Sequence, residues 1–270
     1  MRILFLILVL LASPASAHEL WIEPLDYQPA ADSKITAHIV NGQQFDGFRL
    51  AFIPRNIAAF VIHSGEREAR VESRIGDMPA LNQAALGDGL HVIAYQSTAT
   101  VLTYSDFEKF QTFVRHKDFA GALERHSARG LSQDGVREVY TRFSKSLVGV
   151  GGGAGQDRRL GLETELVALD NPYTDDLANG MHVQLFYAGG IRADAQVELF
   201  EKAPGGKEGA VTIYRTDARG IAALPVKAGH EYMIDAVVLR EPDAETAEKT
   251  RAVWESLWAN MTFAVPAGKP

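Results

Sequence analysis

Short segments in which apolar and polar residues alternate, separated by turn signals, recur along this chain. Residues 34–40 alternate strictly, and residues 90–95 and 100–104 are rich in β-branched and aromatic side chains. Asn-Gly, Asp-Gly and Ser-Gly pairs lie between such segments. Short strands at this spacing are typical of β-sandwiches. We therefore expect residues 18–104 to form an N-terminal β-sandwich.

The last third of the chain shows the same pattern. Residues 181–187 and 195–201 are two strand-like segments joined across a glycine-containing turn, and residues 231–239 form a long apolar segment. These features predict a second, C-terminal sandwich over residues 160–266. The predicted fold class is mainly β, with two immunoglobulin-like or prealbumin-like domains.

The segment between the two sandwiches, residues 105–148, carries helical signals. Ser105 and Glu108 have the spacing of a capping box at the start of a helix. A second helix is expected after residues 132–135, where five apolar residues fall on one helical stripe: Val136, Val139, Tyr140, Phe143 and Leu147. We expect these helices to form a hairpin inserted between the sandwiches.

A glycine-rich segment, residues 149–159, follows the predicted hairpin. Glycine-rich segments chiefly act as flexible linkers. A phosphate-binding loop would need a preceding strand, where we expect a helix, and a following helix with a Lys-Ser or Lys-Thr pair, which the sequence lacks. We therefore interpret this segment as a linker.

The first 17 residues have the pattern of a signal peptide. A charged start is followed by an apolar run over residues 3–11 and by small residues at Ala15 and Ala17. The apolar run is shorter than the roughly 20 residues needed to span a bilayer. Cleavage after Ala17 would make His18 the first residue of an exported, periplasmic protein with no membrane span.

Composition limits the chemistry available to the protein. The 270 residues carry a formal net charge of -7, which provides no basic footprint for nucleic acid. The sequence contains no cysteine, so thiol chemistry is excluded and any metal ligand must be a nitrogen or oxygen atom. No nucleophile-elbow motif of the form G-x-S-x-G is present. We expect a protein that is not an enzyme.

His18 is the candidate metal ligand. A terminal amine and an imidazole both lose their protons near neutral pH, and together they can chelate one metal ion. Nitrogen sites of this kind favour copper, followed by nickel or zinc. His230, beside a strand entrance, is a weaker second candidate. The competing interpretation is that His18 is simply the residue left after cleavage and packs beside Trp21.

Six segments also resemble a known family over nearly all of the chain after residue 17. They are His18-Glu-Leu-Trp-Ile-Glu-Pro24, Tyr140-Thr-Arg-Phe-Ser-Lys-Ser-Leu147, Gly161-Leu-Glu-Thr-Glu-Leu-Val167, Asn171-Pro172-Tyr173, Thr216-Asp217-Ala218-Arg219-Gly220 and Trp254-Glu-Ser-Leu-Trp-Ala259. Together they resemble a domain-of-unknown-function family of exported nickel-uptake-transporter accessory proteins (NikM-subunit-like). The resemblance implies β-sandwich domains in the periplasm and a role with a membrane system that takes up nickel or cobalt.

The resemblance carries over to individual residues only in part. His18 matches the histidine with which many relatives begin. Relatives have further histidines where this chain has Gln43 and Val238. This chain therefore either binds metal through other ligands or binds none strongly.

Two other functions are consistent with the sequence. The first is a non-enzymatic β-sandwich binding or scaffold module without metal. The second, more distant, is a copper oxidase that uses the N-terminal histidine, a chemistry that also requires a second histidine ligand.

Overall fold

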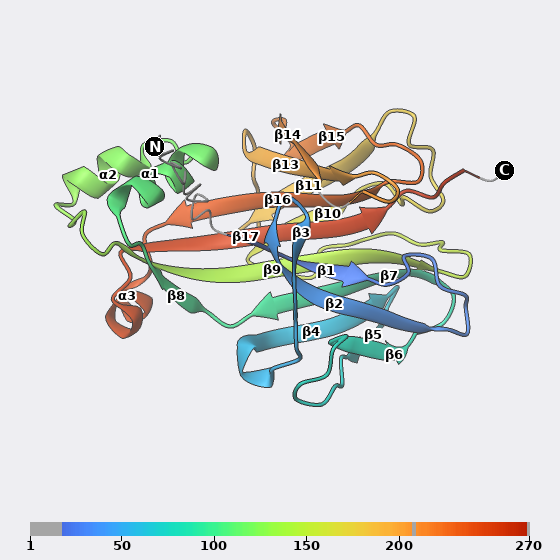
Figure 1. The fold of residues 1–270 in the computed structure, drawn as a ribbon. Helices are drawn as coiled ribbons and strands as arrows, with labels where there is room; N and C mark the ends of the chain where they lie inside the picture. Colours follow the sequence, from blue (N-terminus) through green and yellow to red (C-terminus); the bar gives the residue numbers. More distant parts are fainter. Residues whose placement is uncertain (1–17, 207–208, 269–270) are drawn as a thin grey trace, which may run out of the picture.

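The computed structural model describes residues 18–206 and 209–268, so the predicted signal peptide lies outside the described residues. Strands make up 47% of the chain and helices 11%, in several sheets with a sandwich-like arrangement. The prediction of a mainly-β fold is confirmed (Figure 1).

The central feature is a nine-stranded sheet in the order β14-β13-β16-β17-β9-β7-β4-β5, with β8 paired to β9. Adjacent strands are antiparallel except β17 and β9, which run parallel. The strands are β4 (Ile57–Ser64), β5 (Arg67–Arg70), β7 (Gly89–Ser97), β8 (Thr100–Thr103), β9 (Arg137–Val150), β13 (Gln196–Lys202), β14 (Ala210–Arg215), β16 (Glu231–Arg240) and β17 (Trp254–Ala264).

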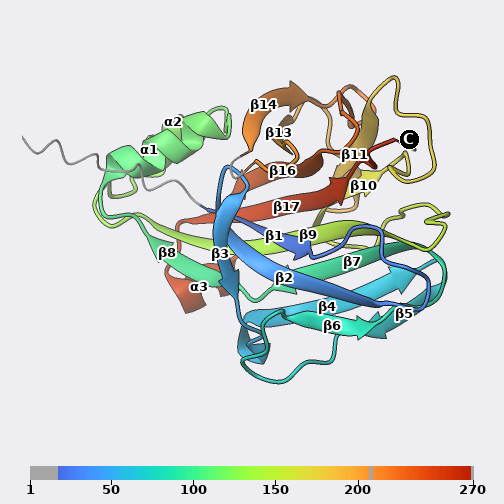
Figure 2. The same cartoon turned by 45° about the vertical axis from the view of Figure 1, so that its right-hand side comes forward.

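Two smaller sheets accompany the central one (Figure 2). The first contains β1 (Glu19–Pro24), β2 (Lys34–Gln43), β3 (Asp46–Leu50) and β6 (Leu81–Ala84). The second contains β10 (Thr164–Ala168), β11 (Met181–Tyr187), β12 (Gly190–Ile191) and β15 (Ile221–Leu224).

Each small sheet covers a different face of the central sheet. Successive side chains of a strand point to opposite faces. Val148 of β9 packs in one apolar core with Ile22 and Ile39 of the first small sheet. Leu147, its neighbour, packs in another core with Leu185 of the second small sheet. The long strand β9 is therefore buried on both faces.

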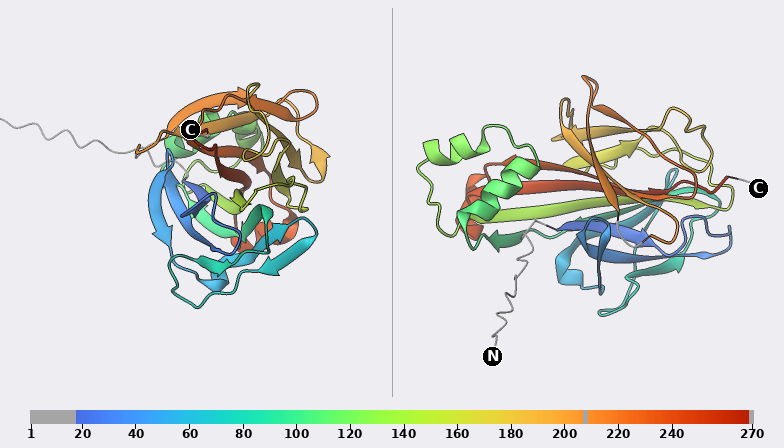
Figure 3. Two further views of the ribbon diagram at one scale, coloured as in Figure 1. Left: turned by 90° about the vertical axis from the view of Figure 1, so that its right-hand side faces the viewer. Right: turned by 45° about the horizontal axis from the view of Figure 1, so that its top comes forward.

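The described residues also form three α-helices and one short 3-10 helix: α1 (Phe107–His116), α2 (Ala122–Ala128), α3 (Ala244–Thr250) and η1 (Pro54–Asn56). α1 and α2 lie at one end of the long central strands (Figure 3). The N-cap of α1 is Asp106, whose carboxylate accepts a hydrogen bond from Lys109 N at 2.9 Å, so the cap lies one residue after the predicted Ser105. In the part of the chain that the structure describes, no helix is long and apolar enough to cross a membrane.

The prediction of a second helix over residues 136–147 is wrong, because this segment is strand β9. Val139, Phe143 and Leu147 are each four residues apart. That spacing fits one stripe of a helix, but it equally fits one face of a strand. A strand buried on both faces shows little alternation, so periodicity alone cannot separate it from a buried helix.

The glycine-rich segment, residues 149–159, packs against its neighbours. The Asn171 side chain donates hydrogen bonds to Gly153 O and Gly155 O, at 2.8 and 2.9 Å. Asp157 lies 2.7 Å from the ammonium group of Lys145. The central sheet also contains strands from both predicted sandwich segments, so the two segments share one sheet.

Candidate functional site

Strand β1 crosses the buried face of β9 and β17 and fixes the position of His18. Ser144 Oγ of β9 donates a hydrogen bond to Leu20 O at 2.8 Å, and Thr262 Oγ1 of β17 donates to Ile22 O at 2.7 Å. His18, the residue before β1, is exposed. The first residue of the predicted mature chain is thus attached to a strand held by the core.

His18 lines two pockets of different character. One has a volume of about 430 Å³ and is also lined by Gln43, Gln44 and Asp46. In the β1–β2 register Glu19 pairs with Gly42, which places Gln43 beside His18. This pocket therefore combines a histidine, two carboxamides and one carboxylate, which we call the Asp46 pocket.

The other pocket, which we call the Arg142 pocket, has a volume of about 280 Å³. It holds two basic side chains and two tyrosine rings, and its lining consists of His18, Asn41, Leu102, Thr103, Tyr104, Ser105, Lys109, Glu138, Tyr140 and Arg142. The Glu138 carboxylate accepts hydrogen bonds from the hydroxyl groups of Tyr104 and Ser256. Burial raises the pKa of Glu138 despite these bonds, which favours its neutral form.

Arg142 is the most unusual residue of this pocket. It is only 6% exposed, and its guanidinium lies 3.9 Å from the ring centroid of Trp258 and 4.9 Å from that of Tyr140. Its buried Nη1 atom has no hydrogen-bond partner among the described residues. Burial lowers the pKa of Arg142 because the charged form is poorly solvated.

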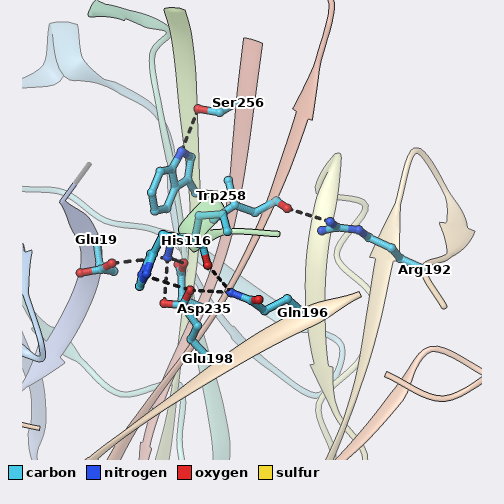
Figure 4. Close-up of polar contacts among 10 residues, drawn as sticks. Glu19, His116, Arg192, Gln196, Glu198, Asp235, Ser256 and Trp258 are labelled. Carbon is cyan, nitrogen blue, oxygen red and sulfur yellow. Dashed lines mark hydrogen bonds and ion pairs between the residues drawn. The ribbon is translucent and has the colours of Figure 1, made fainter. Parts of the chain in front are cut away.

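Three buried carboxylates, those of Glu19, Glu198 and Asp235, lie close together (Figure 4). The ammonium group of Lys117, at the end of α1, lies 2.9 Å from Glu198, 3.1 Å from Asp235 and 3.5 Å from Glu19. Three carboxylates with this spacing would suit a metal ion. Here the ammonium group takes the position between them, so we interpret the cluster as an ion network centred on Lys117.

Burial changes the protonation of this cluster. It raises the pKa of Glu19 to about 7 and also raises the pKa of Asp235, in each case against the attraction of Lys117. The neighbouring carboxylates add to the shift because like charges repel. Burial therefore favours protonation within this cluster, and the titration belongs to the group as a whole.

A second buried ion group, on the opposite face of β9, is fully satisfied. The Lys145 ammonium lies 2.7 Å from Asp157 and 3.2 Å from Glu165. Glu165 also accepts hydrogen bonds from the backbone amides of residues 160–162. This group anchors the glycine-rich segment, and a structural role accounts for all of its contacts.

The structure does not bring the two predicted metal ligands together. Arg142 lines a pocket together with His18. In the central sheet Arg142 of β9 lies opposite Trp258 of β17, which in turn lies opposite Val237 of β16, so His18 lies nearer to position 237 than to position 230. Positions 230 and 237 are seven residues apart, roughly 23 Å along an extended strand. His230 instead has Nδ1 2.8 Å from Glu201 Oε1.

The two positions at which relatives have histidine, Gln43 and Val238, also lie in different parts of the structure. Gln43 lies beside His18 in the Asp46 pocket. Val238 packs with Phe143 and Leu257 in a small apolar cluster. Asp235, three residues earlier on β16, points to the opposite face of the central sheet, toward Lys117.

Sequence reasoning missed Lys117, Arg142 and the buried carboxylates. These residues come from distant parts of the chain, and only strand pairing assembles them. A signal was present in β9, where Glu138, Arg142 and Ser144 occupy alternate positions of one face. That alternation became informative once the segment was known to be a strand.

These features define a mainly-β protein with a buried ion network under its first strand and two pockets beside an exposed histidine. Over residues 15–240 the chain matches the family described as a domain of unknown function (DUF4198), and it belongs to that family. No curated protein matches the chain.

Proposed function

We propose that this protein is a periplasmic, non-enzymatic accessory protein that binds a divalent transition metal, nickel, cobalt or copper, and presents it to a membrane uptake system. Removal of residues 1–17 as a signal peptide frees the amine of His18. The amine and imidazole of His18 then form the first part of the metal site.

The observation that carries this proposal is the position of His18 in the Asp46 pocket. The ligand atoms that the proposal uses are the two nitrogens of a processed His18 and the carboxylate of Asp46, and the lining also includes Gln43 and Gln44. Nitrogen and oxygen donors of this kind fit nickel and copper. Among the charged residues that line this pocket, Asp46 is negative and none is Lys or Arg, which favours a bound cation.

The surrounding structure gives this site rigidity. β1 is pinned to β9 and β17 through Leu20 O and Ile22 O, so the amine is held within a limited volume. Glu19 points into the core and shares the Lys117 ammonium, so its carboxylate is already engaged. A ligand held on a strand loses little freedom on binding metal, which strengthens the site.

Calorimetric titration of nickel and copper into a chain that begins at His18 tests the proposal. We expect one metal ion per chain. An extra glycine before His18, and the substitution His18→Ala, should each weaken binding about tenfold or more because each removes a donor. Asp46→Asn should weaken it less, and His230→Ala, the matched control, should not change it.

Full affinity in both the glycine-extended chain and His18→Ala would contradict the proposed site. Mass spectrometry of the exported protein checks the first step independently, since the mature chain must begin at His18. A mature chain with a different first residue would remove the chelating amine.

A further inference from the structure

The buried guanidinium of Arg142, whose Nη1 atom lacks a hydrogen-bond partner among the described residues, points to a site that the proposed metal chemistry does not use. This side chain is 6% exposed. Burial lowers the pKa of Arg142 and the carboxylates of Asp235, Glu19 and Glu138 oppose this shift, but none of them is hydrogen-bonded to Nη1, and a buried donor left without an acceptor is unfavourable. The contrast with Lys145, whose buried ammonium contacts two carboxylates, shows that this fold pairs such charges elsewhere.

The geometry around Arg142 selects for a planar anion. The guanidinium packs against the rings of Trp258 and Tyr140, so its donors are left at the edge of the group. A carboxylate meets such an edge with two parallel hydrogen bonds. The edge of a stacked guanidinium therefore suits a carboxylate better than a bulky tetrahedral anion.

The pocket itself supplies the other properties of a ligand site. Its volume of about 280 Å³ suits a small molecule, and the rings of Tyr104 and Tyr140 contribute apolar wall. Lys109 adds a second positive charge to the lining. Glu138 is already engaged by two hydroxyl donors, so it does not compete for Arg142.

We propose that the Arg142 pocket binds a small organic carboxylate, with the carboxylate on the Arg142 guanidinium and the rest of the molecule between Tyr104 and Lys109. This site borders the proposed metal site, because His18 lines both pockets, but it differs from that site in its basic lining and needs no metal. Its donors are present whether or not the N-terminus is processed at His18.

Calorimetry or NMR titration of the full mature chain with acetate, benzoate, L-glutamate and inorganic phosphate tests the inference. The buffer is freed of metal by a resin, because soluble chelators are themselves carboxylates. We expect at least one of the three carboxylates to bind more tightly than phosphate. Binding should weaken as salt is added, because the interaction is between charges.

Three variants localise the binding. Arg142→Met should weaken it about tenfold or more, and Arg142→Lys should cause a smaller loss because it keeps the charge without the planar fork. Thr103→Trp fills the pocket from its exposed edge strand and should abolish binding without touching Arg142. Lys249→Gln, an exposed lysine of α3, is the matched control and should change nothing.

Carboxylate binding that is lost in Thr103→Trp and reduced in both Arg142 variants supports the inference, even if Arg142→Met also lowers stability. No binding of any carboxylate by the wild-type chain overturns it. Binding that persists in Thr103→Trp, or phosphate binding equal to that of the carboxylates, also overturns it.

Discussion

Replacing Lys117 with methionine removes the ammonium group that three buried carboxylates share. Glu19, Glu198 and Asp235 are 4%, 1% and 1% exposed, and each lies within 3.5 Å of the Lys117 ammonium. Methionine keeps most of the side-chain packing, so the change is chiefly one of charge. Removing one partner of a buried ion pair costs about 3–5 kcal/mol. We expect Lys117→Met to lower the free energy of unfolding by this amount near neutral pH.

The stability that Lys117→Met removes should depend on pH, and the direction of that dependence follows from the pKa values of the cluster. In the wild type the pKa of Lys117 is raised by the carboxylates, so its contribution is complete throughout pH 5–8. Burial raises the pKa of Glu19 to about 7, and without Lys117 this pKa rises further. A folded-state carboxyl with a raised pKa stabilises the fold less as pH increases through the interval between its unfolded and folded pKa values.

The loss caused by Lys117→Met should therefore grow between pH 5 and pH 8. Each added unit of pKa shift in the variant corresponds to about 1.4 kcal/mol, so a difference of at least about 1 kcal/mol is expected. Urea unfolding at the two pH values measures it. Lys109→Met is the control, because its side chain is 39% exposed and pairs with Asp106 at 3.5 Å, an interaction that contributes about 0–1 kcal/mol. A loss no larger than that of the control, or an equal loss at both pH values, would refute the reasoning.

Two further stability predictions follow from packing and are measured by urea unfolding at pH 7. Asn260→Leu should leave the free energy of unfolding unchanged or raise it by about 1 kcal/mol, because both side-chain polar atoms of Asn260 are buried without a partner among the described residues. A clear loss of stability in this variant would show that these atoms are satisfied in the wild type. Gly149→Ala should lower it by about 1–3 kcal/mol, because the new Cβ would lie 2.6 Å from the Tyr173 ring. Gly152→Ala, where the nearest atom would be 3.3 Å away, is the control and should lower it less.

The sequence predicted the mainly-β fold because alternation and turn residues are local signals. It misassigned residues 136–147 because the buried side chains of β9 lie on both faces, and Val139, Phe143 and Leu147 fit a helical stripe as well as a strand face. β-branched residues such as Val148 and Val150 favoured the strand. The neighbouring strands that bury both faces come from distant parts of the chain, so local periodicity carried no trace of them.

The candidate site was predictable only at His18, whose importance follows from the cleavage pattern. Glu19 and Lys117 are almost one hundred residues apart in sequence, and Asp235 lies 118 residues beyond Lys117. Their proximity depends on the packing of β1 against β9 and β17 and on the position of Lys117 at the end of α1. Neither arrangement has a local sequence signal, so the ion network could not be derived from residue spacing.

The two faces of β9 separate structural charge from charge that is available for function. On one face Lys145 contacts two carboxylates, and those carboxylates accept further backbone hydrogen bonds, so the group is complete without a ligand. On the other face the Arg142 guanidinium has aromatic contacts but a buried nitrogen without a hydrogen-bond acceptor among the described residues. Because the buried ammonium groups of Lys145 and Lys117 are both paired with carboxylates, the Nη1 atom of Arg142 is better explained by a ligand than by poor packing. That face also carries β1 and His18, which places both proposed sites on one side of the central sheet.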